Sequence, residues 1–129
     1  RMYNNLSPNL KSSITRSITQ TFELYMESID WSESKCNIED YMKSWRDYIV
    51  TKALWYSEIP DSTKTSPIFH QEMAVRINEV IERILDEPPT KKQIENIRAL
   101  EKQCNKSYDY SCKAEAAYVE KLLKQQLEQ

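Results

Sequence analysis

The sequence has no glycine in 129 residues, although a chain of this length ordinarily holds about nine. Tight β-hairpin turns depend heavily on glycine, and the loops that hold phosphates or dinucleotides require it. A Rossmann domain and a P-loop NTPase are therefore excluded. Helices joined by proline, serine, threonine, asparagine and aspartate need no glycine, so the absence favours an all-α fold.

Long apolar runs and paired cysteines are also missing. No run of about 18 apolar residues is present, so no transmembrane helix is expected, and no signal peptide is visible. Cys36, Cys104 and Cys112 are scattered and form no C-x-x-C pair. We expect small, buried, reduced side chains in a cytoplasmic or otherwise intracellular protein, with a Cys104–Cys112 disulfide as the alternative. The first residue is arginine, which is compatible with a piece of a longer protein.

Residue sets for catalysis or metal binding are scarce. His70 is the only histidine, and nothing near it in sequence has the spacing of a Ser-His-Asp or Cys-His site. The Glu-x-x-His motif of di-iron bundles is absent, and a zinc site would require His70 to meet the scattered cysteines. We therefore predict no catalytic residues, no metal and no cofactor, and a protein that binds and is not an enzyme.

Apolar residues at intervals of three and four predict five amphipathic helices. The expected ranges are 10–29, 37–58, 67–87, 90–104 and 112–126, with residues 61–66 as a loop. Asn37 is a candidate N-cap, and Thr90 with Gln93 forms a capping box. The pattern predicts an all-α five-helix bundle over residues 1–129. Its alternative is a three-helix bundle joined to a helical hairpin, with a subdomain boundary at 87–90.

The second predicted helix has an unusually broad aromatic face. Its apolar arc covers roughly 160°, whereas about 100° is usual for a surface helix. One reading is a central helix buried on two sides. The other is a surface for a protein partner, because aromatic residues are enriched at interface hot spots. The predicted partner-binding residues of this aromatic strip are Tyr41, Trp45, Tyr48, Lys52 and Trp55.

The fourth predicted helix is locally basic in a chain whose formal net charge is −2. A basic row along a helix can contact phosphates, so nucleic acid is the alternative partner. A solvated helix face explains the same row without any ligand. The candidate nucleic-acid-binding residues are Lys91, Lys92, Arg98, Lys102 and Lys106.

Residues 88–124 resemble a short helical module at the ends of various phage and bacterial proteins. The matching positions are Thr90, Gln93, Ile94, Ile97 and Leu100 in the first helix, and Glu115, Ala116, Val119 and Leu122 in the second. The module often caps its second helix with threonine or serine, where this sequence has Cys112. The resemblance implies a role in DNA transactions of a phage or mobile element, but it gives no residue a function.

Three functions follow as hypotheses from these observations. The leading one is a non-enzymatic adaptor or regulator that binds another protein through the aromatic strip. The alternative is a DNA-associated accessory protein that uses the basic helix. A structural subunit that associates with copies of itself is the second alternative.

Overall fold

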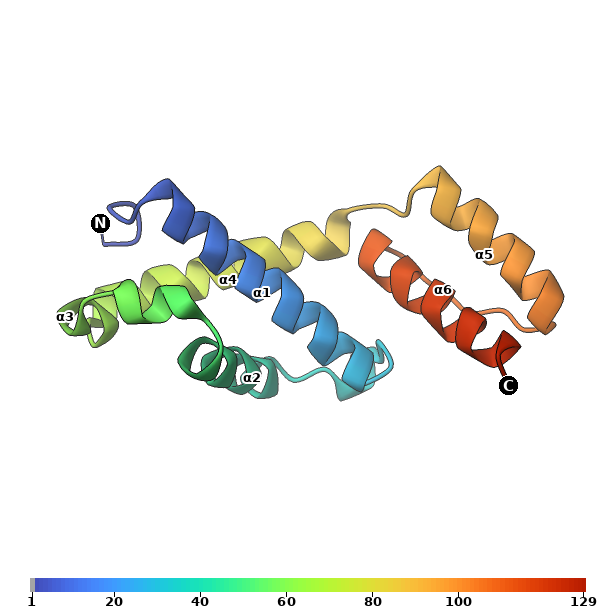
Figure 1. The fold of residues 1–129 in the computed structure, drawn as a ribbon, viewed down its shortest axis with the longest axis horizontal. Coiled ribbons are helices and arrows are strands. Elements are labelled where there is room, and N and C mark those ends of the chain that lie inside the picture. Colours follow the sequence, from blue (N-terminus) through green and yellow to red (C-terminus); the bar gives the residue numbers. More distant parts are fainter. Residues whose placement is uncertain (1) are drawn as a thin grey trace. The chain divides into compact units, whose positions relative to one another are not determined.

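The computed structural model describes residues 2–129, which form helices and turns and contain no strand (Figure 1). The predicted all-α class is confirmed. The chain divides into two compact units, Arg1–Ile81 (unit 1) and Glu82–Gln129 (unit 2). The division falls within a helix, whereas the sequence pointed to the Pro88-Pro89 pair as the subdomain boundary. In the described residues, no helix is long and apolar enough to cross a membrane.

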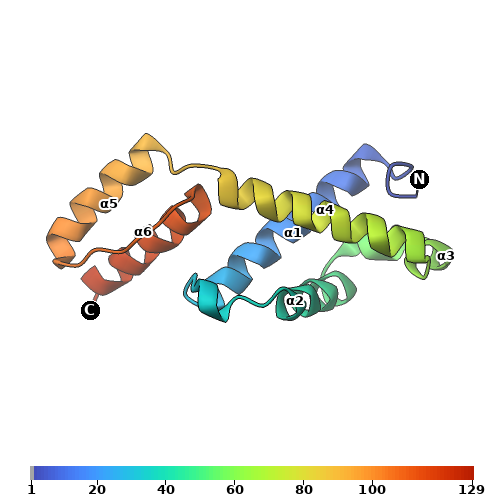
Figure 2. The ribbon, with the colours of Figure 1, turned by 180° about the vertical axis from the view of Figure 1, so that it is seen from behind.

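Unit 1 is built around three long helices, with short turns between them (Figure 2). The elements are α1 (Pro8–Ser28), η1 (Glu33–Lys35), α2 (Ile38–Thr51), η2 (Leu54–Glu58), α3 (Asp61–Lys64) and α4 (Pro67–Asp86), whose last turn belongs to unit 2. The Ser7 side chain caps α1 by accepting the Leu10 N–H at 3.2 Å. Asn37 caps α2, as predicted, by accepting the N–H groups of Glu39 and Asp40.

The prediction of one helix over residues 37–58 is wrong beyond Thr51. Lys52 ends α2, Ala53 is extended, and the chain continues as the 3₁₀ turn η2. The break redirects the chain so that Trp55 and Ile59 are buried, while Leu54 is 88% exposed. Burial of two large apolar side chains outweighs the small preference of this segment for continuing the helix.

The predicted loop 61–66 contains one helical turn, α3. The carbonyl of Pro60 accepts hydrogen bonds from the N–H groups of Thr63 and Lys64, at 3.0 Å each. These bonds close the turn in a sequence whose composition is typical of a loop. The turn matters because it places Lys64 next to the start of α4.

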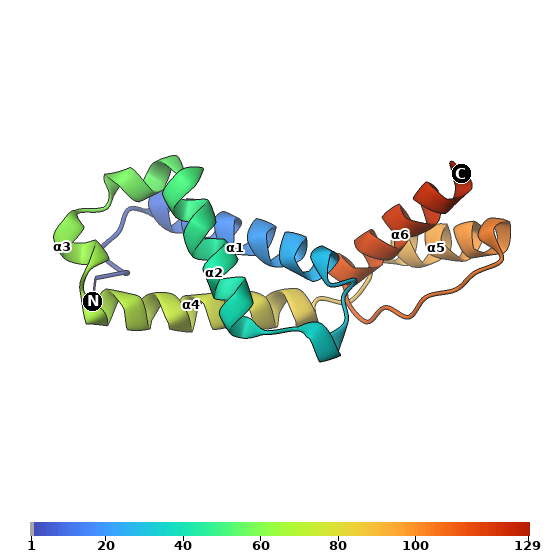
Figure 3. The ribbon, with the colours of Figure 1, turned by 90° about the horizontal axis from the view of Figure 1, so that it is seen from below.

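The buried side chains of unit 1 come mainly from α1, α2 and α4. Figure 3 shows these three helices from below. Two large buried side chains of α2 have their polar groups hydrogen-bonded to α1, whereas the buried Trp31 indole nitrogen has no partner among residues 2–129. The Tyr41 hydroxyl lies 3.0 Å from the Thr21 hydroxyl and donates to the Ile18 carbonyl at 3.2 Å. The Trp45 indole N–H donates to the Ser17 hydroxyl at 3.3 Å. The buried residues of the long helices are Ile14, Ile18, Phe22 and Met26 on α1, Tyr41, Trp45 and Ile49 on α2, and Phe69, Met73, Ile77 and Val80 on α4.

Unit 2 is a helical hairpin of α5 (Lys91–Cys104) and α6 (Lys113–Leu127). The predicted capping box is confirmed, because Thr90 and Gln93 exchange hydrogen bonds of 3.0 Å between side chain and backbone. Cys112 caps α6 with its sulfur 3.5 Å from the Glu115 nitrogen. The buried core consists of Ile97, Ala116, Val119 and Leu123.

All three cysteines are free, so the alternative of a Cys104–Cys112 disulfide is wrong. The expectation of buried thiols holds for Cys112. It is wrong for Cys36, which is exposed, and Cys104 is only half-buried. The sulfur of Cys104 lies close to the Leu123 carbonyl at 3.4 Å, where α5 meets α6.

Candidate functional site

Most of the aromatic strip predicted as a partner surface is interior. Tyr41, Trp45 and Trp55 are 0%, 6% and 8% exposed. Only Lys52 is exposed, and Tyr48 is half-buried. Because Tyr41 and Trp45 find hydrogen-bond partners on α1, their polar groups are buried at little cost. The five residues therefore form no continuous exposed surface, and the buried-helix reading describes most of the strip.

The same helix contributes its neighbouring face to an apolar pocket. This α2–α4 pocket lies within unit 1 and has a volume of about 220 Å³. The lining residues of α2 lie on one face of that helix, and those of α4 lie on one face of theirs, because positions three and four apart are neighbours on a helix surface. Its lining consists of Met42, Trp45, Arg46 and Ile49 from α2, Tyr56 from η2, Lys64 from α3, and Phe69, His70, Met73 and Ala74 from α4.

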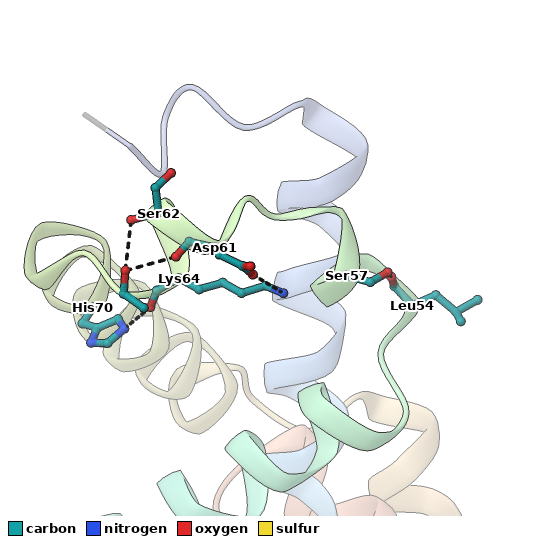
Figure 4. A network of polar contacts seen from close by, with 7 residues as sticks. Leu54, Ser57, Asp61, Ser62, Lys64 and His70 are labelled. Carbon is teal, nitrogen blue, oxygen red and sulfur yellow. Dashed lines mark hydrogen bonds and ion pairs between the residues drawn. The ribbon is translucent and has the colours of Figure 1, made fainter.

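Lys64 is held at the edge of this pocket by several contacts (Figure 4). Its ammonium lies 4.2 Å from the centre of the Tyr56 ring and 3.8 Å from the Asp61 carboxylate. Its backbone carbonyl contacts the ring nitrogen Nε2 of His70. The Lys64 side chain is 19% exposed, whereas that of Asp61 is 100% exposed. The position of the Lys64 charge is thus fixed by burial and the aromatic ring more than by the ion pair.

Arg46 differs from Lys64 in being exposed and free of intramolecular ion pairs. It follows Trp45 on α2, and no ion pair within residues 2–129 includes it. The nearby Lys43 already engages Asp47 at 3.8 Å. Among the described residues that line the pocket there is no carboxylate. The charged side chains that line this pocket, Arg46 and Lys64, are therefore both cationic.

The sequence analysis missed this site, because only Trp45 among its lining residues was a candidate. The available signal was Arg46 beside the apolar face of α2 and His70 directly after Phe69. His70 is exposed and lies at the pocket, not in a catalytic cluster. Across residues 2–129, no group of three or more histidine, cysteine or acidic side chains is placed to hold a metal ion.

All five residues of the predicted basic row are exposed. Lys106 lies beyond α5, which ends at Cys104 with Asn105 as its left-handed cap, so the prediction that it continues the basic face of this helix is wrong. Only three of these five basic residues line a common hollow. A shallow hollow of about 430 Å³ is lined by Arg98, Glu101, Lys102, Asn105, Lys106 and Ser107. Lys91 lies about 10 Å along the helix axis from Arg98 and outside this hollow. Glu101, the one acid in the hollow, accepts the Tyr108 N–H at 3.3 Å.

No protein-family model, curated protein or solved structure matches this chain. The resemblance of residues 88–124 to a phage or plasmid module stays a prediction.

Proposed function

We propose that this chain is a non-enzymatic protein-interaction module, an adaptor or regulator, and that it binds its partner through the α2–α4 pocket. The observation that carries the proposal is an apolar pocket on a helical scaffold, surrounded by cationic side chains. Interface hot spots are large side chains inserted into well-packed, desolvated pockets. This pocket replaces the aromatic strip as the expected site of contact on α2.

The size of the pocket favours a protein partner over a cofactor or metabolite. Its volume is about 220 Å³. Pockets for drug-sized molecules and cofactors usually have about 300–1,000 Å³. A space of this size is suited to one large aliphatic or aromatic side chain that projects from a partner.

The test is a selection of random peptides of about 12 residues on the immobilised full chain. We expect an enriched peptide group that shares one large apolar residue. Ala74 is an exposed residue at the pocket, so Ala74→Trp fills the site without disturbing the core. Ala99→Trp places the same bulk at an exposed position of α5 and is the matched control.

Binding of the enriched peptides should weaken at least about 10-fold with Ala74→Trp and stay unchanged with Ala99→Trp. Circular dichroism of both variants verifies that the helices are retained. A selection that enriches no peptide, or peptides that bind Ala74→Trp as tightly as the wild type, would contradict the proposal.

A second candidate function is a nucleic-acid-associated accessory, and the hollow on α5 favours it. Arg98, Lys102 and Lys106 line one exposed depression, and no ion pair in the described part of the chain engages them. Three phosphate contacts predict that log K falls with log salt at a slope of about −2 to −3. Fluorescence anisotropy with single- and double-stranded oligonucleotides measures this slope.

The triple alanine variant of Arg98, Lys102 and Lys106 should lose that binding. The triple alanine variant of Lys35, Lys43 and Lys52, which are exposed in unit 1, removes the same charge outside the hollow and is the matched control. Flat titrations up to tens of micromolar at low salt would eliminate this second function.

A further inference from the structure

The charged groups of the α2–α4 pocket indicate which charge a partner carries beside the apolar side chain that enters the pocket. Arg46, Lys64 and His70 bring nitrogen groups to its lining, and no lining residue carries a carboxylate. Asp61 is the acid paired with Lys64, at 3.8 Å, but its side chain is 100% exposed, so solvent screens that pair. The local field at the pocket thus favours a negative charge.

Arg46 is the residue best placed to recognise such a charge. It is exposed on α2, and no ion pair among residues 2–129 engages it. A guanidinium presents a planar fork of N–H groups that binds carboxylates in a bidentate manner. Lys64 adds a second cation whose position is already fixed over the Tyr56 ring, so little conformational freedom is lost on binding.

We infer that the partner is a protein segment with a large apolar side chain for the α2–α4 pocket and an aspartate or glutamate within a few residues for Arg46. This inference rests on the proposed function and adds a charge rule to it. The carboxylate contributes specificity, because a partner with the same apolar residue and no acid leaves Arg46 without a counter-charge.

The peptides enriched on the full chain supply the probe. We expect an acidic residue at a constant distance from the shared apolar residue. Changing that acid to its amide in a synthetic peptide should weaken binding by about 5- to 10-fold, and Arg46→Glu should weaken it at least as much. Lys43→Glu makes the same charge change at an exposed position of α2 outside the pocket, and it should change the affinity less than about 2-fold.

A charge exchange makes the test specific to one pair of groups. A peptide with lysine in place of its acid should bind the wild type weakly and regain most of its affinity for the Arg46→Glu variant. Regained affinity would support a direct pairing, which a general loss of stability in the variant cannot imitate.

The outcomes separate this inference from the function on which it rests. Enriched peptides that lose binding to Ala74→Trp but carry no common acid would overturn the charge rule and leave the proposed function standing. No enrichment at all would overturn both. If free N-acetyl-phenylalanine bound as tightly as the peptides, the inferred ligand class would be wrong, because the site would then recognise a small organic acid.

Discussion

Unit 1 buries Tyr41 and Trp45, whose polar groups bond to α1, whereas the fully buried cluster of unit 2 consists of Ile97, Ala116, Val119 and Leu123, which carry no polar side-chain group. A small aliphatic cluster with tyrosines packed against its edge is compatible with two regular, well-capped helices. Large rings with polar groups need specific partners, and α1 supplies them to Tyr41 and Trp45. The helix break after Thr51 and the turns η2 and α3 instead bring Tyr56 and Lys64 to the α2–α4 pocket.

The two units also differ in what they expose. The large apolar residues with high exposure in unit 1 are Leu24, Ile38, Val50, Leu54, Ile68 and Val75, whereas in unit 2 they are Leu85 and Leu127. Exposed apolar side chains cost little singly, but they add contact area when a partner covers them. Unit 1 is therefore the expected site of protein binding, and the basic hollow of unit 2 is the expected site of any phosphate binding.

Truncation of the small aliphatic core gives the largest expected effect. Leu123→Ala should destabilise unit 2 by about 2–5 kcal/mol, because Leu123 is fully buried in the one buried cluster of this small hairpin. All three tryptophans lie in unit 1, so their fluorescence reports that unit alone. We expect the unfolding curve from circular dichroism to gain an early step that tryptophan fluorescence does not show. A single transition shared by both signals would mean that the two units unfold together, which would contradict their independent stability.

The polar core of unit 1 predicts a pH dependence at high pH. Burial raises the pKa of Tyr41 from 10.0 to about 12, and the hydrogen bond with Thr21 opposes this rise. Because the folded state favours the neutral phenol, its stabilising contribution is complete below pH 10 and is lost as the pH rises towards 12. A pKa rise from 10.0 to about 12 corresponds to roughly 2–3 kcal/mol of unfolding free energy.

Denaturant unfolding monitored by tryptophan fluorescence between about pH 9 and pH 11.5 measures this loss. Tyr41→Phe should flatten the slope and cost about 1 kcal/mol near pH 7, since two hydrogen bonds are removed. Tyr48→Phe is the control, because the Tyr48 hydroxyl is 3.5 Å from Gln20, its one hydrogen-bond partner among residues 2–129. An unchanged slope in Tyr41→Phe would show that another group titrates.

The regular ends of unit 2 predict a smaller effect. Thr90→Ala removes the side-chain acceptor of the Gln93 N–H and half of the capping box. We expect a loss of about 1 kcal/mol from unit 2 in the circular-dichroism transition, with no change in tryptophan fluorescence. A fluorescence change as large as the circular-dichroism change would contradict the assignment of Thr90 to unit 2 alone.

The smallest effect is expected at the C-cap of α5, where glycine would adopt the observed backbone conformation more easily than asparagine does. Asn105 ends α5 at φ 55°, in the left-handed region, where asparagine is tolerated and glycine is favoured. Asn105→Gly should stabilise unit 2 by a few tenths of a kcal/mol. Ala99→Gly, at an exposed position in the middle of α5, should instead destabilise it by about 1 kcal/mol. Equal effects of the two substitutions would exclude this role of the left-handed residue.

The contrast between the units also explains what the sequence could predict. The ends of α1, α4, α5 and α6 lie within about two residues of their predicted positions because proline, serine or threonine marks most of them. No proline follows the end of α2 at Thr51 until Pro60, nine residues later. The residues that follow keep a helical apolar spacing, and only the burial of Trp55 and Ile59 in the folded unit decides against helix.

The candidate site was unpredictable for the same reason. Tyr56 and Lys64 reach the α2–α4 pocket only because the chain leaves the helix at Lys52 and forms α3 before α4. A wheel drawn for an unbroken helix placed Trp55 beside Tyr48 and gave no reason to associate Arg46 with His70. The basic row was visible in the sequence because four of its five residues belong to one regular helix, α5, and only Lys106 lies beyond its end.

The most direct test of the central claim is a two-dimensional ¹H–¹⁵N spectrum of the full chain, titrated with the tightest peptide from the selection. Binding at the α2–α4 pocket predicts shifts of the Trp45 indole signal and of backbone signals in residues 42–49 and 69–74, with α5 unchanged. Shifts confined to residues 98–107, or none in residues 69–74, would contradict it.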